Sequence, residues 1–428
     1  MTSKNPQECF VYITLPGETE EVVAARFEIR QSRAGPSGRL VYGRSYLQRR
    51  NAVEIDPIEL QTLDGQTNVH IGDSPLFPSL RDALPDRWGR LVIDRAEGGE
   101  LDDLGYLLRS PDDRAGALGF GLGATPPAPK YAFNKTLRLK ELMEAADKII
   151  ADKDADPELV RRLEQLNLAG TSMGGARPKA VVEDDDGLWI AKFPRHDDRF
   201  DIPRAEHAML RLAQEAGISA AGSKLAVVGD RPVLLVKRFD REKVDDGYLR
   251  HRMISSLTAL QASESATQRD RWSYPLFADV LTKVDVDPAR SKRELFKRVA
   301  FSALISNSDD HPRNHAMIAD ARGWRLSPAY DLLPNPQVAQ YDRVLAMRIG
   351  DEGRLATASN ILSSSSRFGV PREEAAALLA EMRALVSRRW YPLCKSVGVS
   401  ETDCKLLASA FDFEGFAPEV APRTESVP

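Results

Sequence analysis

The chain has 428 residues, of which 29% are charged and 42% are hydrophobic, as in ordinary globular proteins. Its 59 Lys and Arg residues and 63 Asp and Glu residues give a net charge of −4, which argues against a broad basic coat for naked nucleic acid but leaves room for a local patch. The three cysteines are scattered, so neither a disulfide scaffold nor a CxxC zinc site organises the fold.

No apolar run approaches the roughly 18 residues that a membrane-spanning helix needs. The first residues, MTSKNPQECF, lack the basic segment and apolar core of a signal peptide. We therefore expect a cytoplasmic protein with no membrane association.

The first 125 residues are predicted to form a small β-rich subdomain. The expected elements are strands at 10–15 and 22–29, a helical stretch from 80 to 92 that breaks at Pro85, and a close-packed strand at 115–120. The run 123–129 is rich in Gly and Pro and is typical of a linker. We place a boundary at residue 125.

Two further parts, 126–240 and 241–416, are predicted to follow. The first is expected to hold helices at 137–152, 157–168 and 203–217 and strands at 180–182, 188–193 and 233–239. The second is mainly helical, and is expected to hold a buried helix that ends at 306–308, a hairpin from 315 to 326 and an amphipathic helix at 372–390. The tail 417–428 is expected to be flexible. Together these parts predict an α+β fold.

The segment SDDHPRNH at 308–315 carries the residue types that phosphoryl transfer needs. A carboxylate must accept the proton of the substrate hydroxyl, and oxygen ligands must hold Mg²⁺ close by. Asp309 and Asn314 have the Asp-to-Asn spacing of a protein-kinase catalytic loop. The hairpin that follows leads to Asp331. We expect the hairpin to bring Asp331 back beside Asn314, where it would be a second Mg²⁺ ligand.

Other parts of a kinase site occur in the expected order. Gly170, Gly174 and Gly175 permit the backbone to approach phosphates closely. Lys192 lies in a predicted strand, where a kinase holds its phosphate-contacting lysine. Glu206 on the next predicted helix is a candidate ion-pair partner for this lysine.

Each feature alone has a plainer interpretation. A glycine-rich loop is more often a turn, Lys192 could lie on an exposed edge strand, and Glu206 could be a solvated helix residue. His311 and His315 are four apart and could bind zinc on a helix, but Pro312 between them argues against a regular helix. The order and spacing of all the parts favour a kinase.

Eight segments of the chain, which together span most of it, resemble one known family. They are PLFPSLRDALPDRWGR (75–90), DDRAGALGF (112–120), GTSMGGARPKA (170–180), WIAKFP (189–194), AEHAMLRLAQEAGI (205–218), LLVKRFDR (234–241), ISNSDDHPRNHAMI (305–318) and LSPAYDLLP (326–334). These segments resemble the HipA family of bacterial serine/threonine kinases, the toxins of type II toxin–antitoxin modules. The resemblance implies a two-lobed protein-kinase-like fold, with the β-rich subdomain joined to the N-lobe.

The resemblance also implies a role for each matching residue. The catalytic aspartate falls on Asp309, and the metal ligands fall on Asn314 and Asp331. The implied ATP-binding residues are Ser172, Gly174, Gly175, Lys179, Lys192, Lys237, Phe239, His311, Asn314 and Asp331. Ser172 matches the serine whose autophosphorylation inactivates the kinase. The implied cofactors are ATP and Mg²⁺.

The implied function is that of a serine/threonine protein kinase that acts as a toxin. Its substrate would be a translation component such as an aminoacyl-tRNA synthetase, and its partner a helix-turn-helix antitoxin through which the pair binds operator DNA. Two alternatives stay open. A small-molecule kinase of the aminoglycoside-phosphotransferase type has a similar constellation, although the segment GALGF argues for the toxin family. A non-catalytic co-repressor would bind the antitoxin only, although the intact catalytic residues argue against it.

Overall fold

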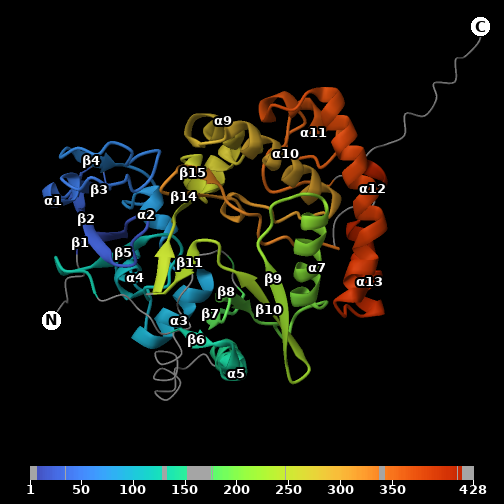
Figure 1. Ribbon diagram of the computed structural model, residues 1–428, viewed down its shortest axis with the longest axis horizontal. Helices are drawn as coiled ribbons and strands as arrows, with labels where there is room; N and C mark the ends of the chain where they lie inside the picture. The colour runs from blue at the N-terminus through green and yellow to red at the C-terminus, as the bar shows by residue number, and fades with distance from the viewer. Residues whose placement is uncertain are drawn as a thin grey trace, which may run out of the picture.

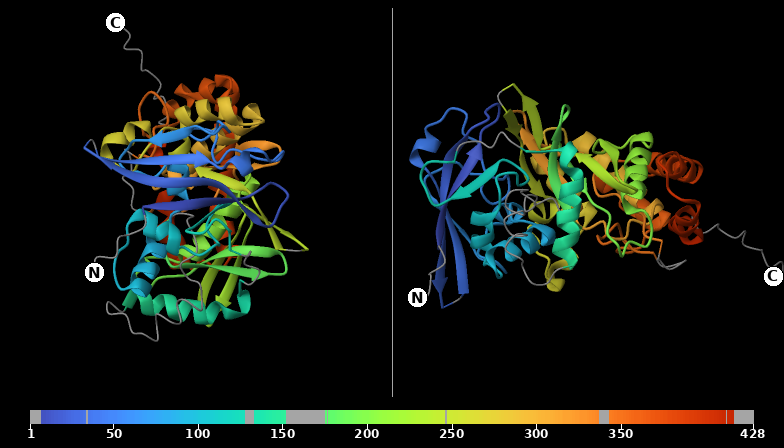
Figure 2. Two further views of the ribbon diagram at one scale, coloured as in Figure 1. Left: turned by 90° about the vertical axis from the view of Figure 1, so that its left-hand side faces the viewer. Right: turned by 90° about the horizontal axis from the view of Figure 1, so that it is seen from below.

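The computed structural model shown in Figure 1 describes most of the chain. The described residues are 7–33, 35–127, 133–151, 175, 177–245, 247–336, 343–411 and 413–416. They form an α+β fold with a β-rich N-terminal subdomain, a central lobe built on a second sheet and a mainly helical C-terminal lobe. Figure 2 shows the first sheet at one end of the molecule and the last helices at the other.

The N-terminal subdomain is an antiparallel sheet with the strand order β4-β3-β2-β1-β5. Its strands are β1 (Glu8–Thr14), β2 (Glu21–Ser32), β3 (Gly35–Tyr42), β4 (Thr67–His70) and β5 (Leu118–Gly121), and its helices are α1 (Arg44–Leu47), α2 (Pro78–Asp82), α3 (Arg87–Glu97) and α4 (Asp103–Arg109). Alternate residues of the strands face a core that includes Val11, Phe27 and Leu40. The predicted break at Pro85 separates α2 from α3.

The central lobe contains a second sheet with the order β6-β7-β8-β10-β9. Its elements are β6 (Asn134–Lys135), α5 (Leu139–Ala151), β7 (Lys179–Asp184), β8 (Gly187–Lys192), α7 (Ile202–Glu215), β9 (Ser223–Val228) and β10 (Arg231–Lys237). One face, with Trp189 and Leu235, packs on α5 and on Trp88 of α3. The other face, with Leu234 and Val236, packs with α7 into the core of the C-terminal lobe.

The C-terminal lobe contains the 308–315 segment, which lies between helix α10 and strand β14. Its strands are β11 (Arg241–Val244), β12 (Gly247–Arg250), β13 (Arg252–Ser255), β14 (Ala316–Asp320) and β15 (Gly323–Leu326). Its α-helices are α8 (Ser256–Ala259), α9 (Tyr274–Val284), α10 (Pro288–Leu304), α11 (Ala358–Ser363), α12 (Arg372–Ser396) and α13 (Glu401–Leu407). The buried side of α10 includes Leu295, Val299 and Leu304, so this helix anchors the loop that follows it.

The sequence predictions hold for most elements, with shifted ends. The helix predicted at 372–390 runs to Ser396 despite Pro392 within it, and the strand predicted at 115–120 begins at Leu118. The predicted helix 157–168 and the tail 417–428 lie outside the described residues. The division at residues 125 and 240 stays a prediction.

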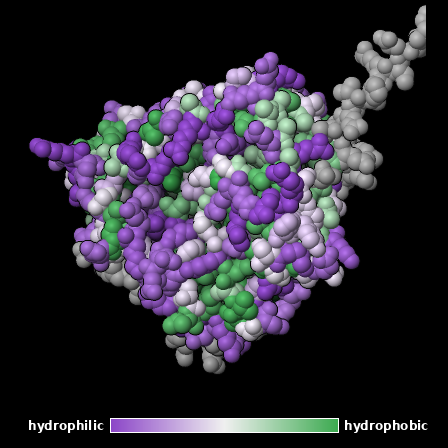
Figure 3. Space-filling view, turned by 45° about the vertical axis from the view of Figure 1, so that its right-hand side comes forward, coloured by the Kyte–Doolittle hydropathy of each residue, from purple (hydrophilic) through white to green (hydrophobic). Residues whose placement is uncertain are grey.

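None of the helices in the described ranges is long and apolar enough to cross a membrane. Hydrophilic residues predominate on the face in Figure 3, and hydrophobic ones gather mainly near its lower edge.

Candidate functional site

The loop after α10 presents two neighbouring carboxylates in very different surroundings. Asp310 is buried, and its carboxylate accepts a hydrogen bond from the hydroxyl of Tyr274 at 2.6 Å and lies 2.9 Å from Nε2 of His315. Asp309 is exposed, and its carboxylate makes no hydrogen bond or ion pair with the residues that the structure describes. Asp310 therefore anchors the loop to α9, and Asp309 is the carboxylate left open to a substrate.

Asn314 is held beside Asp309 with one side-chain atom unused. It is buried in the short 3₁₀ turn Pro312–Asn314, and its Nδ2 donates to the carbonyl oxygen of Asp309 at 3.1 Å. Its Oδ1 is buried and has no hydrogen-bond partner within the described part of the chain. A buried amide oxygen without a partner is costly, so this atom indicates a missing ligand.

Lys192, the last residue of β8, forms two ion pairs. Its Nζ lies 2.6 Å from Oε1 of Glu206 on α7 and 2.6 Å from Oδ1 of Asp331. The predicted Lys192–Glu206 pair is confirmed, and Glu206 is buried rather than solvated. Asp331 has φ = +58°, a left-handed conformation that few residues other than Gly, Asn and Asp adopt.

The pKa shifts follow from burial and from these charges. Partial burial raises the pKa of Asp309. The positive charge of His311 opposes this rise, and the carboxylate of Asp331 adds to it. Burial alone would raise the pKa of Asp331, but the adjacent Lys192 outweighs it and holds that pKa below its usual range. For Glu206 burial dominates, and its pKa is raised.

The donor set fits a Mg²⁺ ion. Asn314 Oδ1 is an orphaned acceptor, and Asp331 contributes a carboxylate, both of them hard oxygen donors. Within the described ranges no group of three His, Cys, Asp or Glu residues could hold a metal. Two protein donors leave most of the octahedral shell to phosphate oxygens and water, as Mg²⁺ bound with a nucleotide prefers.

The described end of the predicted phosphate loop is tied to the N-terminal subdomain. Lys179 is buried, and its Nζ lies 2.5 Å from Oδ2 of Asp86, which also caps α3 by accepting from Gly89 N. Trp88 Nε1 donates to the carbonyl oxygen of Lys179 at 2.9 Å. Gly175 has φ = +107°.

Two of the predicted nucleotide-binding residues, Ser172 and Gly174, lie outside the described residues. Their predicted roles in the phosphate loop stay predictions.

Of the two predicted hinge residues, Phe239 lies near the site. Its ring packs against Tyr330, with 5.6 Å between centroids. Lys237 pairs with Trp189 in the sheet, whereas Lys192 pairs with Leu234, so the two lysines point from opposite faces. The Lys237 side chain covers the Trp189 ring and donates to the carbonyl of Asp186. Any contact of Lys237 with an adenine ring would come from its backbone.

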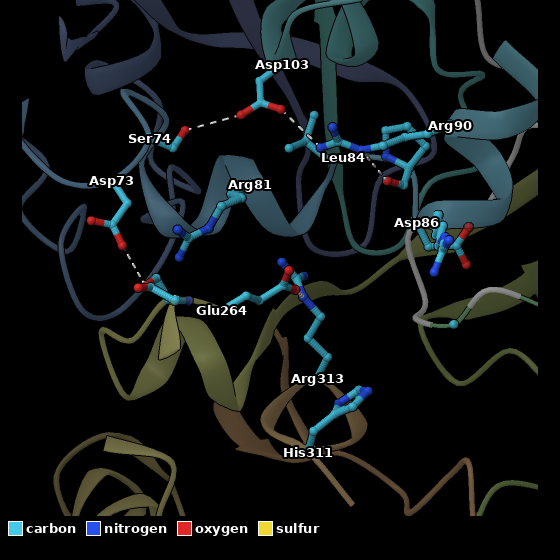
Figure 4. A pocket seen from close by; sticks show the side chains of 15 residues that line it. Asp73, Ser74, Arg81, Leu84, Asp86, Arg90, Asp103, Glu264, His311 and Arg313 are labelled. Carbon is cyan, nitrogen blue, oxygen red and sulfur yellow. Dashed lines mark hydrogen bonds and ion pairs between the residues drawn. The ribbon is translucent and has the colours of Figure 1, made fainter. Parts of the chain in front are cut away.

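His311 lines a hollow of about 780 Å³ beside the loop 308–315 (Figure 4). Asp86, Arg81 and Arg313 line it too. Sequence reasoning missed Asp86, which lies more than 90 residues before Lys179, and it missed the Asp310–Tyr274 bond, because neither pair has a local spacing signal. In the sequence, only the family resemblance of the segment PLFPSLRDALPDRWGR indicated that Asp86 could matter.

Comparison with known proteins gives consistent results. The family model described as the HipA-like C-terminal domain matches residues 171–390. The chain is 28% identical over 302 residues to the putative kinase Y4mE of Sinorhizobium fredii, covering 66% of this chain and 69% of that protein. It is 26% identical over 162 residues to the serine/threonine-protein kinase toxin HipA of Shewanella oneidensis, covering 34% of this chain and 37% of that protein.

A solved structure of the Shewanella oneidensis toxin–antitoxin system, HipA with HipB and its operator DNA, has a chain with a similar fold. The TM-score is 0.62 at 18% identity, over 93% of this chain and 95% of that chain.

Proposed function

Because the chain belongs to the family of the HipA-like C-terminal domain, we propose that it is an ATP-dependent serine/threonine protein kinase. The observation that carries this proposal is the arrangement of the open Asp309 carboxylate, the unpartnered Asn314 Oδ1 and the Lys192–Asp331 pair. Phosphoryl transfer needs a proton acceptor, oxygen ligands for a divalent ion and a lysine for the phosphates.

In this proposal each residue has one task. Asp309 orients the acceptor hydroxyl and takes its proton, while its neighbour Asp310 keeps the loop in place. Lys192 holds the α- and β-phosphates and is itself held by Glu206. Mg²⁺ held by Asn314 and Asp331 would neutralise charge on the phosphates. Catalysis then comes from positioning and electrostatic stabilisation.

The Asp309→Asn variant tests this assignment. Removing a general base costs on the order of 10²–10⁴ in rate, so transfer of ³²P from ATP to protein should fall at least about 100-fold. Asp351→Asn, a change of the same kind at an exposed turn, should keep wild-type transfer. An Asp309→Asn protein that melts like the wild type and still transfers phosphate would refute the role of Asp309.

We propose further that the protein acts as a toxin with a helix-turn-helix antitoxin, through which the pair binds operator DNA. The support is the Shewanella structure, a complex of HipA with HipB and its operator DNA. The proposed substrate is a translation component such as an aminoacyl-tRNA synthetase. Phosphoproteomics of cells that express the wild type or Asp309→Asn would identify it, and no phosphosite that depends on Asp309 in a translation component would refute this choice.

Self-inactivation at Ser172 completes the proposal. A phosphate there adds nearly two negative charges where the nucleotide phosphates bind, and it would block ATP. A Ser172→Ala variant should keep its activity after incubation with ATP. If that variant is still silenced, the switch lies elsewhere.

A further inference from the structure

A hollow beside the loop 308–315 adjoins a second hollow, and three residues line both. The first, of about 780 Å³, begins at His311 and Arg313. The second, of about 520 Å³, ends at strand β4. Asp73, Arg81 and Ser263 line both. We call the joined space the acceptor groove. It runs between the N-terminal subdomain and the loop 261–268, and each half has the volume of an ordinary ligand site.

The carboxylates along the first half of the groove are already engaged. Asp103 pairs with Arg90 at 3.0 Å, and Glu264 pairs with Arg313 at 2.5 Å. Asp73 accepts from the hydroxyl of Ser263 at 2.7 Å. The remaining carboxylate of this half is Asp86, which holds Lys179 as described above. An acidic group on an occupant would therefore meet carboxylates whose charges are largely neutralised or hydrogen-bonded.

Two arginines of the same half have no carboxylate partner among the described residues. Arg81 donates through Nη2 to the carbonyl oxygen of Ala262 at 3.0 Å, and its Nε is buried without a partner. Figure 4 shows its guanidinium pointing from α2 into the hollow. Arg87, at the start of α3, is exposed and makes no ion pair there. The half of the groove next to the loop 308–315 therefore holds two guanidinium groups that no carboxylate of the described residues pairs with.

The far half of the groove has a different character. Val69 is 51% exposed and Ile71 is 79% exposed, although both are apolar. They lie on and just after β4, which is the edge strand of the first sheet in the described part of the chain, and an edge strand can pair with a further strand. An edge strand with exposed apolar side chains suits an extended polypeptide better than a small molecule.

We propose that the acceptor groove binds an extended segment of the protein substrate. The segment places an acidic side chain against Arg81 and Arg87, close to the acceptor hydroxyl, and an apolar side chain against Val69 and Ile71. This inference rests on the proposed function, because it supplies the acceptor for that phosphotransfer.

A charge reversal tests the acidic position. The full-length kinase is assayed with Mg²⁺-ATP on a library of Ser/Thr-centred peptides in which one flanking position at a time is Asp, Lys or Ala. The wild type should label peptides with Asp at one fixed position about fivefold faster than those with Ala. Arg87→Glu should reverse this order in favour of Lys at the same position. The matched control Arg290→Glu, at an exposed site on α10 away from the groove, should keep the wild-type order.

If the Arg87→Glu variant labels the Asp, Lys and Ala peptides in the same order of rates as the wild type, the groove assignment is wrong, because the kinase would then select peptides without the groove. Inhibition of peptide labelling by a 20-mer of oligo-dT, lost in Arg87→Glu, would also overturn it and assign the groove to nucleic acid. Failure of the wild type to label any peptide or lysate protein while it binds Mg²⁺-ATP would instead refute the proposed protein-kinase function itself.

Ile71→Asp tests the far end independently. This side chain is exposed, so the substitution should not disturb the core. Labelling of peptides with Leu at a position distant from the acceptor should fall several-fold relative to matched Ala peptides. Equal loss for Leu and Ala peptides would remove the apolar contact from the proposal.

Discussion

Two buried charge clusters of the molecule differ in how completely their polar atoms are satisfied. In the first, Arg238 and Arg241 both bond to Asp240, and their other donors reach the backbone carbonyls of Asp113, Arg114 and Gly116. In the second, the single ammonium of Lys192 faces two carboxylates, Glu206 and Asp331, and the oxygen of Asn314 nearby has no partner.

The difference separates a structural cluster from a ligand site. The first cluster joins residues 113–116 of the N-terminal subdomain to the strand end after β10, and no buried side-chain nitrogen or oxygen of Arg238, Asp240 or Arg241 lacks a partner among the described residues. The second has an excess of negative charge and an unused acceptor, and it lies where we propose that Mg²⁺ and ATP bind. A buried cluster that is incomplete on its own is the stronger indication of a site.

The largest expected effect comes from breaking the first cluster. Asp240→Ala leaves two buried guanidinium groups without their carboxylate, and removal of one partner of a buried ion pair costs roughly 3–5 kcal/mol. The free energy of unfolding, measured in urea, should fall by about that amount. Asp197→Ala breaks an exposed pair with Arg195 and should leave the urea midpoint nearly unchanged. Equal midpoints for the two variants would show that the Asp240 cluster is not structural.

Asp331→Asn should differ from Asp240→Ala, because its main effect should be on phosphotransfer and not on stability. Asn tolerates the positive φ of this position, and the substitution leaves Lys192 balanced by Glu206 alone. Stability without nucleotide should therefore fall only modestly, because the ion pair that lowers the pKa of Asp331 is lost but Lys192 keeps Glu206, whereas phosphotransfer should fall about 100-fold or more because a charge that serves the transition state is lost. Thermal melting and an ATP phosphotransfer assay measure the two quantities. A large loss of melting temperature would place Asp331 among the structural residues.

A smaller effect concerns pH and Glu21, which pairs with Arg250 at 2.8 Å across the same subdomain boundary. Burial raises the pKa of Glu21 to about 7, against the opposing charge of Arg250. Between about pH 4.3 and 7 the folded protein binds a proton that the unfolded chain releases, so stability falls as pH rises. Glu21→Gln should flatten this fall by on the order of 2 kcal/mol in urea unfolding at pH 5 and 7.5. A parallel pH profile in the variant would exclude Glu21 as its cause.

Local patterns predicted the parts of the fold that depend on local physics. Alternation located β1 and β2, helical spacing located α7 and α10, and the 308–315 spacing selected Asp309 and Asn314. The Lys192–Glu206 pair could be proposed because a strand lysine and a helix glutamate follow each other in chain order. These patterns can be read from the sequence because the residues that form them are near one another in the chain or follow a known order along it.

Long-range complementarity could not be predicted in this way. The spacing of the segment does not distinguish Asp310 from Asp309, and the contacts of Asp310 with His315 and with Tyr274 from a distant helix show which one is engaged. The direction of Lys237 depends on its register with Trp189. The groove depends on residues from 59 to 313 meeting in space, and the lack of a carboxylate partner for Arg81 and Arg87 appears only after the ion pairs are assigned.

The contacts of α3 have a consequence for how such proteins diversify. Trp88 is buried in the core of the central lobe, and Asp86 holds Lys179 there, although both precede residue 171, where the match to the family model begins. The segment that the family model matches is therefore smaller than the unit that packs together. A gene fusion or truncation that kept only this segment would lose part of its own hydrophobic interior, so the N-terminal subdomain and the matched segment are expected to be inherited together.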